Sequence, residues 1–197
     1  MPSEDRTPER GKAALAGLSV AVFGSSEPGE GSPAYEEARR LGSLLARSGA
    51  RVITGGYGGV MEGASRGARE SGGEAVGVTG SFFPDRAPNP WLSEIVPSAD
   101  LFERTRLLIE LSDAFIILPG KSGTIAELAF LWALDRAARL GEKPVVLCGT
   151  IWPPLLDAIE RAGALEPAQR STTALCPAVD EAVALLVRRL GKERKGA

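Results

Sequence analysis

Mostly apolar runs without polar alternation are the clearest pattern in the chain. One of them reads Ala-Phe-Ile-Ile-Leu, at residues 114–118. A strand covered on both faces of a parallel sheet has no polar side, so such runs are typical of central parallel strands. The other predicted strands, of which the last two are the weakest, are residues 18–23, 51–54, 74–78, 143–148, 92–96 and 172–175.

Between these runs, apolar residues recur every three or four positions, which is the period of an amphipathic helix. In residues 33–48 the apolar side consists of Tyr35, Ala38, Leu41 and Leu45. Proline is favourable at the first helical position, and glycine is a common stop, which fits Pro33 and Gly49. The same pattern predicts helices at residues 60–70, from residue 100 onward, from the turn at 119–123 to about 140, at 154–162 and at 178–190.

Strict alternation of strands and helices predicts an α/β fold, with a Rossmann-like parallel sheet and helices on both faces in a single domain. We place this domain at residues 16–191, between a flexible N-terminal arm (residues 1–15) and a basic C-terminal tail (residues 192–197). Residues 79–90 interrupt the alternation with two phenylalanines and three prolines. A segment of this length without regular structure suggests a functional loop.

The composition excludes several classes of function. A net charge of −2 and the lack of an apolar run near ~20 residues give no reason to expect nucleic-acid or membrane binding. The first residues lack the apolar segment of a secretory signal, and the only two cysteines, Cys148 and Cys176, sit in or beside apolar stretches. We therefore expect reduced core thiols in a cytoplasmic protein.

The 197 residues include no histidine. This removes Ser-His-Asp and Cys-His catalysis and histidine-ligated metals. We expect no metal and no cofactor. Any chemistry has to rest on carboxylates, arginine, lysine, hydroxyls and backbone dipoles.

Three glycine-rich turns follow predicted strands, at the edge of the sheet where Rossmann-like folds bind ligands. They are Gly24-Ser25-Ser26, Gly55-Gly56-Tyr57-Gly58-Gly59 and Gly120-Lys121-Ser122-Gly123. Unpaired N–H groups at the following helix starts make such turns ready anion sites. Each turn alone is equally compatible with a purely structural role, but three at one edge favour a nucleotide or phosphate pocket.

The familiar nucleotide fingerprints are absent. The first turn reads Gly-Ser-Ser-Glu-Pro-Gly, and the second strand ends in glycines rather than an acid, which disfavours NAD. Gly120-Lys121-Ser122 resembles the end of a Walker A motif, but Phe115 stands where that motif needs a glycine. ATPase activity is unsupported.

Two charged residues are not explained by a solvated helix face. On a helical wheel Arg104 falls between Leu108 and Leu111, on the inward side, where an unpaired guanidinium is too costly. A structural ion pair, a snorkelling side chain or a bound anion would each satisfy it. Thr124-Ile-Ala-Glu127 matches a capping box, in which both side chains cap the helix. Glu127 also lies on the inner side of its helix, where it can reach a ligand.

Together these residues resemble the LOG (Lonely guy) family, whose members are often labelled possible lysine decarboxylases. The family pattern P-G-G-x-G-T-x-x-E, with an arginine on the preceding helix, appears here at residues 119–127 with Arg104. Phe23-Gly-Ser-Ser, Tyr35 and the segment from Gly55 to Met61 also match. The resemblance covers about residues 18–150.

The resemblance implies a homodimer that hydrolyses nucleoside 5′-monophosphates to free base and ribose 5-phosphate. Arg104 and Glu127 match the catalytic pair of the family, and nothing resembles a pyridoxal-phosphate site. The predicted phosphate- and ligand-binding residues are Gly24, Ser25, Ser26, Gly55, Gly56, Gly58, Gly59, Met61, Gly120, Lys121, Ser122, Gly123 and Thr124.

Three positions depart from the family pattern. Lys121 replaces the second glycine, Thr105 follows Arg104 where active members usually have lysine, and Ala126 replaces a common glutamate. With these changes the chain resembles a divergent branch of the family, similar to the molybdenum-cofactor carrier proteins. Those proteins bind a phosphorylated pterin without hydrolysing nucleotides. The leading hypothesis is a nucleoside monophosphate hydrolase. The alternative is a non-enzymatic nucleotide- or molybdenum-cofactor-binding carrier, from which sequence does not separate a nucleotide sensor.

Overall fold

The computed structural model describes residues 13–193, with side chains as far as residue 191. Its first half contains β1 (Ser19–Phe23), α1 (Pro33–Arg47), β2 (Arg51–Thr54), α2 (Val60–Glu70), β3 (Ala75–Gly80) and β4 (Glu94–Ser98). Its second half contains α3 (Leu101–Glu110), β5 (Ala114–Ile117), α4 (Ser122–Arg136), β6 (Val145–Cys148), α5 (Trp152–Arg161), α6 (Pro167–Thr172), β7 (Thr173–Cys176) and α7 (Val179–Glu193).

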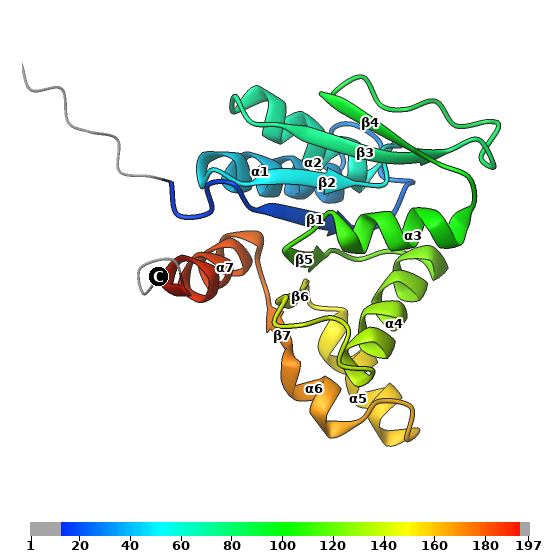
Figure 1. Cartoon of the computed structure of the whole chain (residues 1–197), viewed down its shortest axis with the longest axis vertical. Coiled ribbons are helices and arrows are strands. Elements are labelled where there is room, and N and C mark those ends of the chain that lie inside the picture. The colour runs from blue at the N-terminus through cyan, green and yellow to red at the C-terminus, as the bar shows by residue number, and fades with distance from the viewer. Residues whose placement is uncertain (1–12, 194–197) are drawn as a thin grey trace, which may run out of the picture.

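The described strands form one sheet in the order β4-β3-β2-β1-β5-β6-β7, and every neighbouring pair is parallel. The predicted Rossmann-like parallel α/β fold is therefore confirmed (Figure 1). From β1 the chain moves outward to β4, then returns to β5 on the other side of β1 and moves outward again. The direction of winding changes between β1 and β5, and such a switch point leaves a crevice at the carboxyl ends of the strands.

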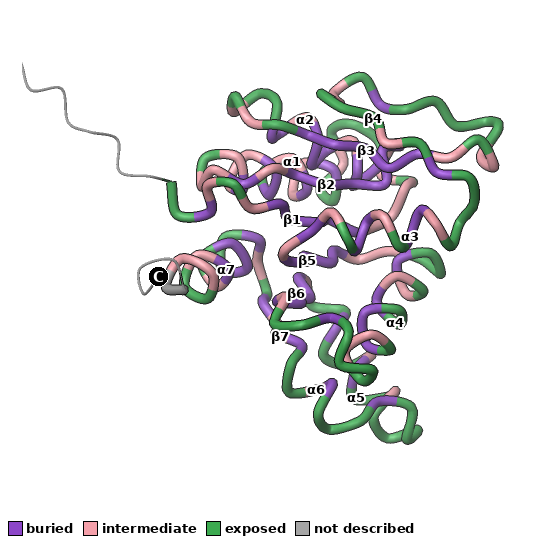
Figure 2. Tube along the Cα trace, viewed as in Figure 1, coloured by how far each residue is buried: buried purple, intermediate pink, exposed green. Residues whose placement is uncertain are grey.

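Alternate residues of the central strands feed two separate cores. In β5, Ala114 and Ile116 join the core formed with α1, α2 and α7, whereas Phe115 and Ile117 join the core formed with α3, α4 and α5. Both faces are covered, which explains the continuous apolar runs. Figure 2 shows the buried residues concentrated in these strands and on the inward sides of the helices.

Helices α1 and α2 pack closely because glycines lie where they cross. An added Cβ at Gly42 would lie 2.0 Å from the carbonyl oxygen of Ala64, and one at Gly67 would lie 1.8 Å from that of Arg39. No larger residue fits at either position without separating the helices. These contacts fix how closely α1 and α2 approach each other.

Several predicted boundaries need correction. The pattern did not predict α6, and β4 lies two residues later than predicted, because its register is set by pairing with β3. Helix α4 ends at Arg136 rather than near residue 140, since Ala138 adopts a left-handed conformation (φ 54°). Helix α5 begins two residues early, at Trp152.

The two predicted terminal segments fall mostly outside the described residues. Of the arm predicted at residues 1–15, residues 1–12 lie outside, but Leu15 is fully buried in the core of α1, α2 and α7. Of the tail predicted at residues 192–197, residues 194–197 lie outside, and α7 continues to Glu193. Among residues 13–193, no helix combines the length and apolar character needed to cross a membrane.

Candidate active site

A pocket of about 250 Å³ lies at the switch point between β1 and β5. Its walls come from the turn after β1, the turn after β2, the loop after β3, the start of α3 and the first turns of α4. In Rossmann-like sheets, ligands bind at this place. The topology thus brings the three predicted turns to one edge.

Arg104 enters this pocket from α3. Asp100 caps the helix by accepting a hydrogen bond from the Glu103 N–H (2.8 Å), and Arg104 falls on the buried side with only 6% of its surface exposed. Its Nε donates to the carbonyl oxygen of Val78 (2.9 Å) and its Nη2 to that of Gly55 (3.0 Å). A carbonyl group within β3 and one just after β2 hold the guanidinium, and the prediction that Arg104 points inward is confirmed.

Glu127 faces Arg104 from the second turn of α4. Its Oε1 lies 3.9 Å from Nη1 of Arg104, and 16% of the side chain is exposed. Burial raises the pKa of the Glu127 carboxyl to about 7, while the charge of Arg104 acts in the opposite direction. Burial also lowers the pKa of Arg104, against the effect of Glu127. A carboxyl group that titrates near neutral pH in a pocket is suited to acid–base or electrostatic catalysis.

The capping box predicted for Thr124 and Glu127 is wrong. Helix α4 already begins at Ser122, with Lys121 as its N-cap residue and no side-chain cap. Thr124 therefore lies within the first turn and packs against Gly120, where an added Cβ would come within 2.1 Å of its Oγ1. The chain turns into the helix before Thr124, so the carboxylate of Glu127 is not used for capping.

Most of the predicted ligand-binding residues line the pocket. They are Gly24, Ser25, Ser26, Gly55, Met61, Lys121, Gly123 and Thr124, together with Arg104 and Glu127. The remaining predicted residues, Gly56, Gly58, Gly59, Gly120 and Ser122, do not line it. Gly59, for example, shapes its turn: its φ is +74°, and an added Cβ would lie 2.4 Å from the carbonyl oxygen of Ser25. Ligand binding by all of these residues stays a prediction.

The three positions that depart from the LOG pattern all border the pocket. Lys121 Nζ pairs with Glu27 Oε1 at 2.5 Å, across the rim between the turn after β1 and the start of α4. Thr105 lines the wall, and its Oγ1 donates to the carbonyl oxygen of Leu101 within the same helix (2.9 Å). Ala126 adds only a methyl group to the lining.

Sequence analysis missed the residues that the loop after β3 contributes. Phe83 and Arg86 line the pocket, as does Tyr57 from the turn after β2. The rings of Tyr57 and Phe83 meet edge-on at 5.5 Å, and the guanidinium of Arg104 lies 5.7 Å from the centre of each. The length and aromatic content of residues 79–90 predicted a functional loop. They did not indicate which of its side chains turn inward.

Among the described residues, the charged and aromatic side chains named above are the groups that give the pocket its chemical character. Within that span, no three His, Cys, Asp or Glu side chains are grouped as a bound metal ion would require. The arrangement offers a buried acid, a buried guanidinium and the start of a helix. These groups suit a ligand with an anionic end and a reaction that develops positive charge.

Comparison with known proteins agrees with this arrangement. The model of the SLOG cluster4 family matches residues 17–169. The chain is 35% identical over 176 residues to a cytokinin riboside 5′-monophosphate phosphoribohydrolase of Rhodococcoides fascians, which covers 85% of this chain and 88% of that protein. It is 30% identical over 175 residues to an enzyme of the same name from Arabidopsis thaliana, covering 83% of this chain and 79% of the relative.

The solved structures that share the fold include a molybdenum cofactor binding protein. The molybdenum cofactor binding protein of Rippkaea orientalis superimposes with a TM-score of 0.66 at 25% identity, over 86% of this chain and 94% of that one. The family model covers most of the domain, and curated relatives above 30% identity align along most of their own length. The resemblance to LOG proteins is confirmed, and the chain belongs to the SLOG cluster4 family.

Proposed function

We propose that the protein is a nucleoside 5′-monophosphate phosphoribohydrolase, which cleaves the N-glycosidic bond to give a free base and ribose 5-phosphate. The observation that carries this proposal is the buried pair of Arg104 and Glu127 at the switch-point pocket, 3.9 Å apart, with a carboxyl pKa of about 7. The relatives named as cytokinin riboside 5′-monophosphate phosphoribohydrolases support the same reaction.

The reaction breaks the bond between C1′ and the base, and water supplies a hydroxyl to C1′ and a proton to the base. Glycosidic cleavage passes through a transition state that resembles an oxocarbenium ion. Ionised Glu127 would stabilise that cation or orient the attacking water. Arg104 is held by two backbone carbonyls, so it would position the ligand with little reorganisation. The N–H groups at the start of α4 would bind the phosphate.

The proposed substrate is a nucleoside 5′-monophosphate, and the names of the relatives make a cytokinin riboside 5′-monophosphate one of the candidates. We also propose that the protein works in the cytoplasm as a homodimer. Leu101, Phe102 and Phe130 are exposed large apolar residues at the pocket mouth, with exposed fractions of 52%, 75% and 43%. A second copy packed on this side of α3 and α4 would bury them.

The second candidate is a binding or carrier protein that holds a nucleotide or a phosphorylated pterin without turnover. The departures at Lys121, Thr105 and Ala126 favour it, because a binder need not keep the hydrolytic arrangement. The shared fold and 25% identity with the molybdenum cofactor binding protein also support it. The same pocket would then retain its ligand rather than release products.

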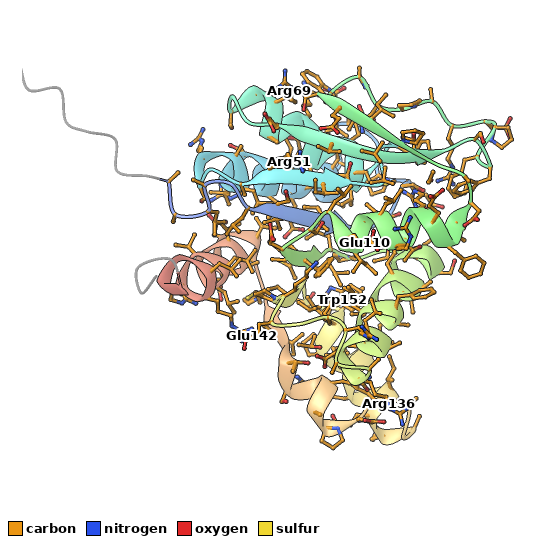
Figure 3. The ribbon with its side chains drawn as sticks, in the orientation of Figure 1. Arg51, Arg69, Glu110, Arg136, Glu142 and Trp152 are labelled. Carbon is orange, nitrogen blue, oxygen red and sulfur yellow. The ribbon has the colours of Figure 1, made fainter. Side chains whose placement is uncertain are left out.

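The deciding experiment measures release of base and ribose 5-phosphate from AMP and other nucleoside monophosphates. Glu127→Gln should lower the rate by about 100- to 10,000-fold, the usual contribution of a positioned carboxyl group. Glu110→Gln is the matched control: Glu110, which is labelled on α3 in Figure 3, is exposed and pairs with Arg106. Saturable nucleotide binding without release of base from any substrate would reject the enzyme and favour the carrier.

A further inference from the structure

Arg86 is a pocket cation without a carboxylate partner in the described part of the chain. Of the cationic side chains that line the pocket, Arg104 pairs with Glu127 and Lys121 pairs with Glu27, whereas Arg86 forms no ion pair within residues 13–191. Its guanidinium lies 5.1 Å from the centre of the Phe83 ring. These contacts leave its charge unneutralised at the pocket wall.

The loop that carries Arg86 is fixed at both ends to the turn after β2. The hydroxyl of Tyr57 donates to the carbonyl oxygen of Gly80 (2.9 Å) and accepts from its N–H (2.8 Å). At the other end, Asn89 is buried and donates from Nδ2 to the carbonyl oxygen of Tyr57 (3.1 Å), and its N–H donates to that of Gly56 (2.9 Å). The exposed residues between these anchors, including Arg86, are thereby held beside the pocket.

Arg86 also contacts the turn that packs on the start of α4. Its Nη1 donates to the hydroxyl of Ser26 at 3.3 Å, which is a long bond to a neutral partner. The neighbouring Ser25 N–H donates to the carbonyl oxygen of Pro119 (3.2 Å), just before α4. Arg86 therefore lies on the same side of the pocket as the unpaired N–H groups of the α4 start.

The charges that line the pocket favour an anion. Arg86, Arg104 and Lys121 carry three positive charges against one carboxylate, Glu127, and the outer Glu27 neutralises only Lys121. Even with Glu127 ionised, one positive charge is left over. A phosphate group is the ligand part that can use it, because a phosphate accepts two short, charge-assisted bonds from one guanidinium.

We propose that Arg86 binds the phosphate group of the ligand, together with the start of α4, and exchanges the hydroxyl of Ser26 for a phosphate oxygen. Arg86 thereby makes the site prefer phosphate monoesters over the same molecules without phosphate. This assignment rests on the proposed function in that both place a phosphorylated ligand in one pocket. It does not depend on turnover, since a carrier of a phosphorylated pterin would use the same contact.

The experiment compares binding of AMP, ribose 5-phosphate and adenosine by calorimetry in the Glu127→Gln protein, in which we expect hydrolysis to be strongly slowed. Three further substitutions are made in this protein: Arg86→Ala, Arg86→Lys and, as control, Arg136→Ala. Arg136 is also an exposed arginine and lies at the far end of α4, roughly 20 Å from the helix start at 1.5 Å per residue (Figure 3).

Arg86→Ala should weaken AMP and ribose 5-phosphate about 10- to 100-fold and adenosine less than about twofold, the range expected for a lost charged contact. Arg86→Lys should restore part of the affinity, and Arg136→Ala should change none. Equal affinities in Arg86→Ala and Arg136→Ala would overturn the assignment. So would an equal loss for adenosine, because Arg86 would then act through the loop or the base.

The failure of this assignment and that of the proposed function are distinguishable. If the wild-type protein hydrolyses AMP and Arg86→Ala does so with unchanged KM, the function stands and the assignment falls. If AMP binding depends on Arg86 and no nucleotide is hydrolysed, the assignment of Arg86 stands and the proposed hydrolase activity is rejected. If no phosphate monoester binds, both fall.

Discussion

Replacing Glu127 with glutamine should change the pH dependence of folding stability in a defined direction. The ordinary pKa of a glutamate is 4.5, and burial raises that of Glu127 to about 7. Between these values the folded protein holds a proton that the unfolded chain releases. The free energy of unfolding of the wild type must therefore fall as pH rises through this window, and the loss is nearly complete by about pH 8.

The size of the effect follows from the same two values. Each pKa unit corresponds to about 1.36 kcal/mol, so the interval from 4.5 to about 7 amounts to about 3 kcal/mol. Glu127 is only 16% exposed, so screening by solvent removes little of it. Glutamine keeps the shape of the side chain but cannot ionise. As pH rises from about 4.5 to about 8, the free energy of unfolding of Glu127→Gln should therefore increase by about 3 kcal/mol relative to that of the wild type.

The assay is urea denaturation of both proteins across this pH range, with stability obtained by linear extrapolation. Glu110→Gln gives the baseline for the same chemical change on the exposed side of α3. Parallel curves for wild type and Glu127→Gln, within about 0.5 kcal/mol at every pH, would refute the reasoning, because the carboxylate would then not be desolvated. If the ionised form is the active one, kcat/KM of the wild type should rise with pH and level off above about 7.

Gly55→Ala places a Cβ 1.8 Å from Nη2 of Arg104, so we expect the guanidinium to move, base release to fall about 100-fold or more, and thermal unfolding to shift down. Wild-type rates in this variant would show that the position of Arg104 is unimportant. Leu108→Ala should lower the free energy of unfolding by about 2–5 kcal/mol in urea denaturation, because Leu108 is fully buried between α3 and the sheet. A loss below about 1 kcal/mol would contradict that packing. Lys121→Ala removes an exposed pair with Glu27, so stability should change by less than about 1 kcal/mol and AMP affinity less than in Arg86→Ala; a larger loss of affinity would place the phosphate at Lys121.

The elements that sequence predicted best are those in which the hydrophobic pattern ends at residues that also terminate a helix or strand. The boundaries of β2 and α2 are as predicted, because an apolar run or a helical period ends there at glycines that the local geometry requires. Gly59 at the start of α2 has a φ of +74°, which only glycine adopts readily. Such residues fix an end of an element by local sterics, so the sequence carries the information within a few positions.

The elements that sequence missed, such as α6, or misplaced, such as β4, depend on distant neighbours. Helix α6 has only six residues, and its Gln169 donates to the carbonyl oxygen of Trp132, in α4. Strand β4 is mostly exposed, tolerates Pro97 at the sheet edge and takes its register from β3. Neither element has an apolar period of its own. In the site, Arg104 and Glu127 could be found on helical wheels, whereas Arg86 is placed by loop anchors that no local pattern describes.

Arg104 and Glu127 were predictable because they are charged residues on the inward sides of their helices, where apolar residues are expected. A buried ion pair is commonly no more stable than apolar residues of similar volume, so packing alone gives little reason to keep one between α3 and α4. The structure satisfies the guanidinium with the carbonyl oxygens of Val78 and Gly55, two acceptors that lie just beyond the point where the pairing of β2 with β3 ends, at Thr54 and Gly77. It does not satisfy the carboxylate as well: Arg104 lies 3.9 Å away, and the pKa is still raised to about 7. The pocket thus holds a fixed guanidinium beside a carboxylate whose ionised form is destabilised by burial. Selection for stability alone would replace this pair, whereas catalysis or ligand binding can use it.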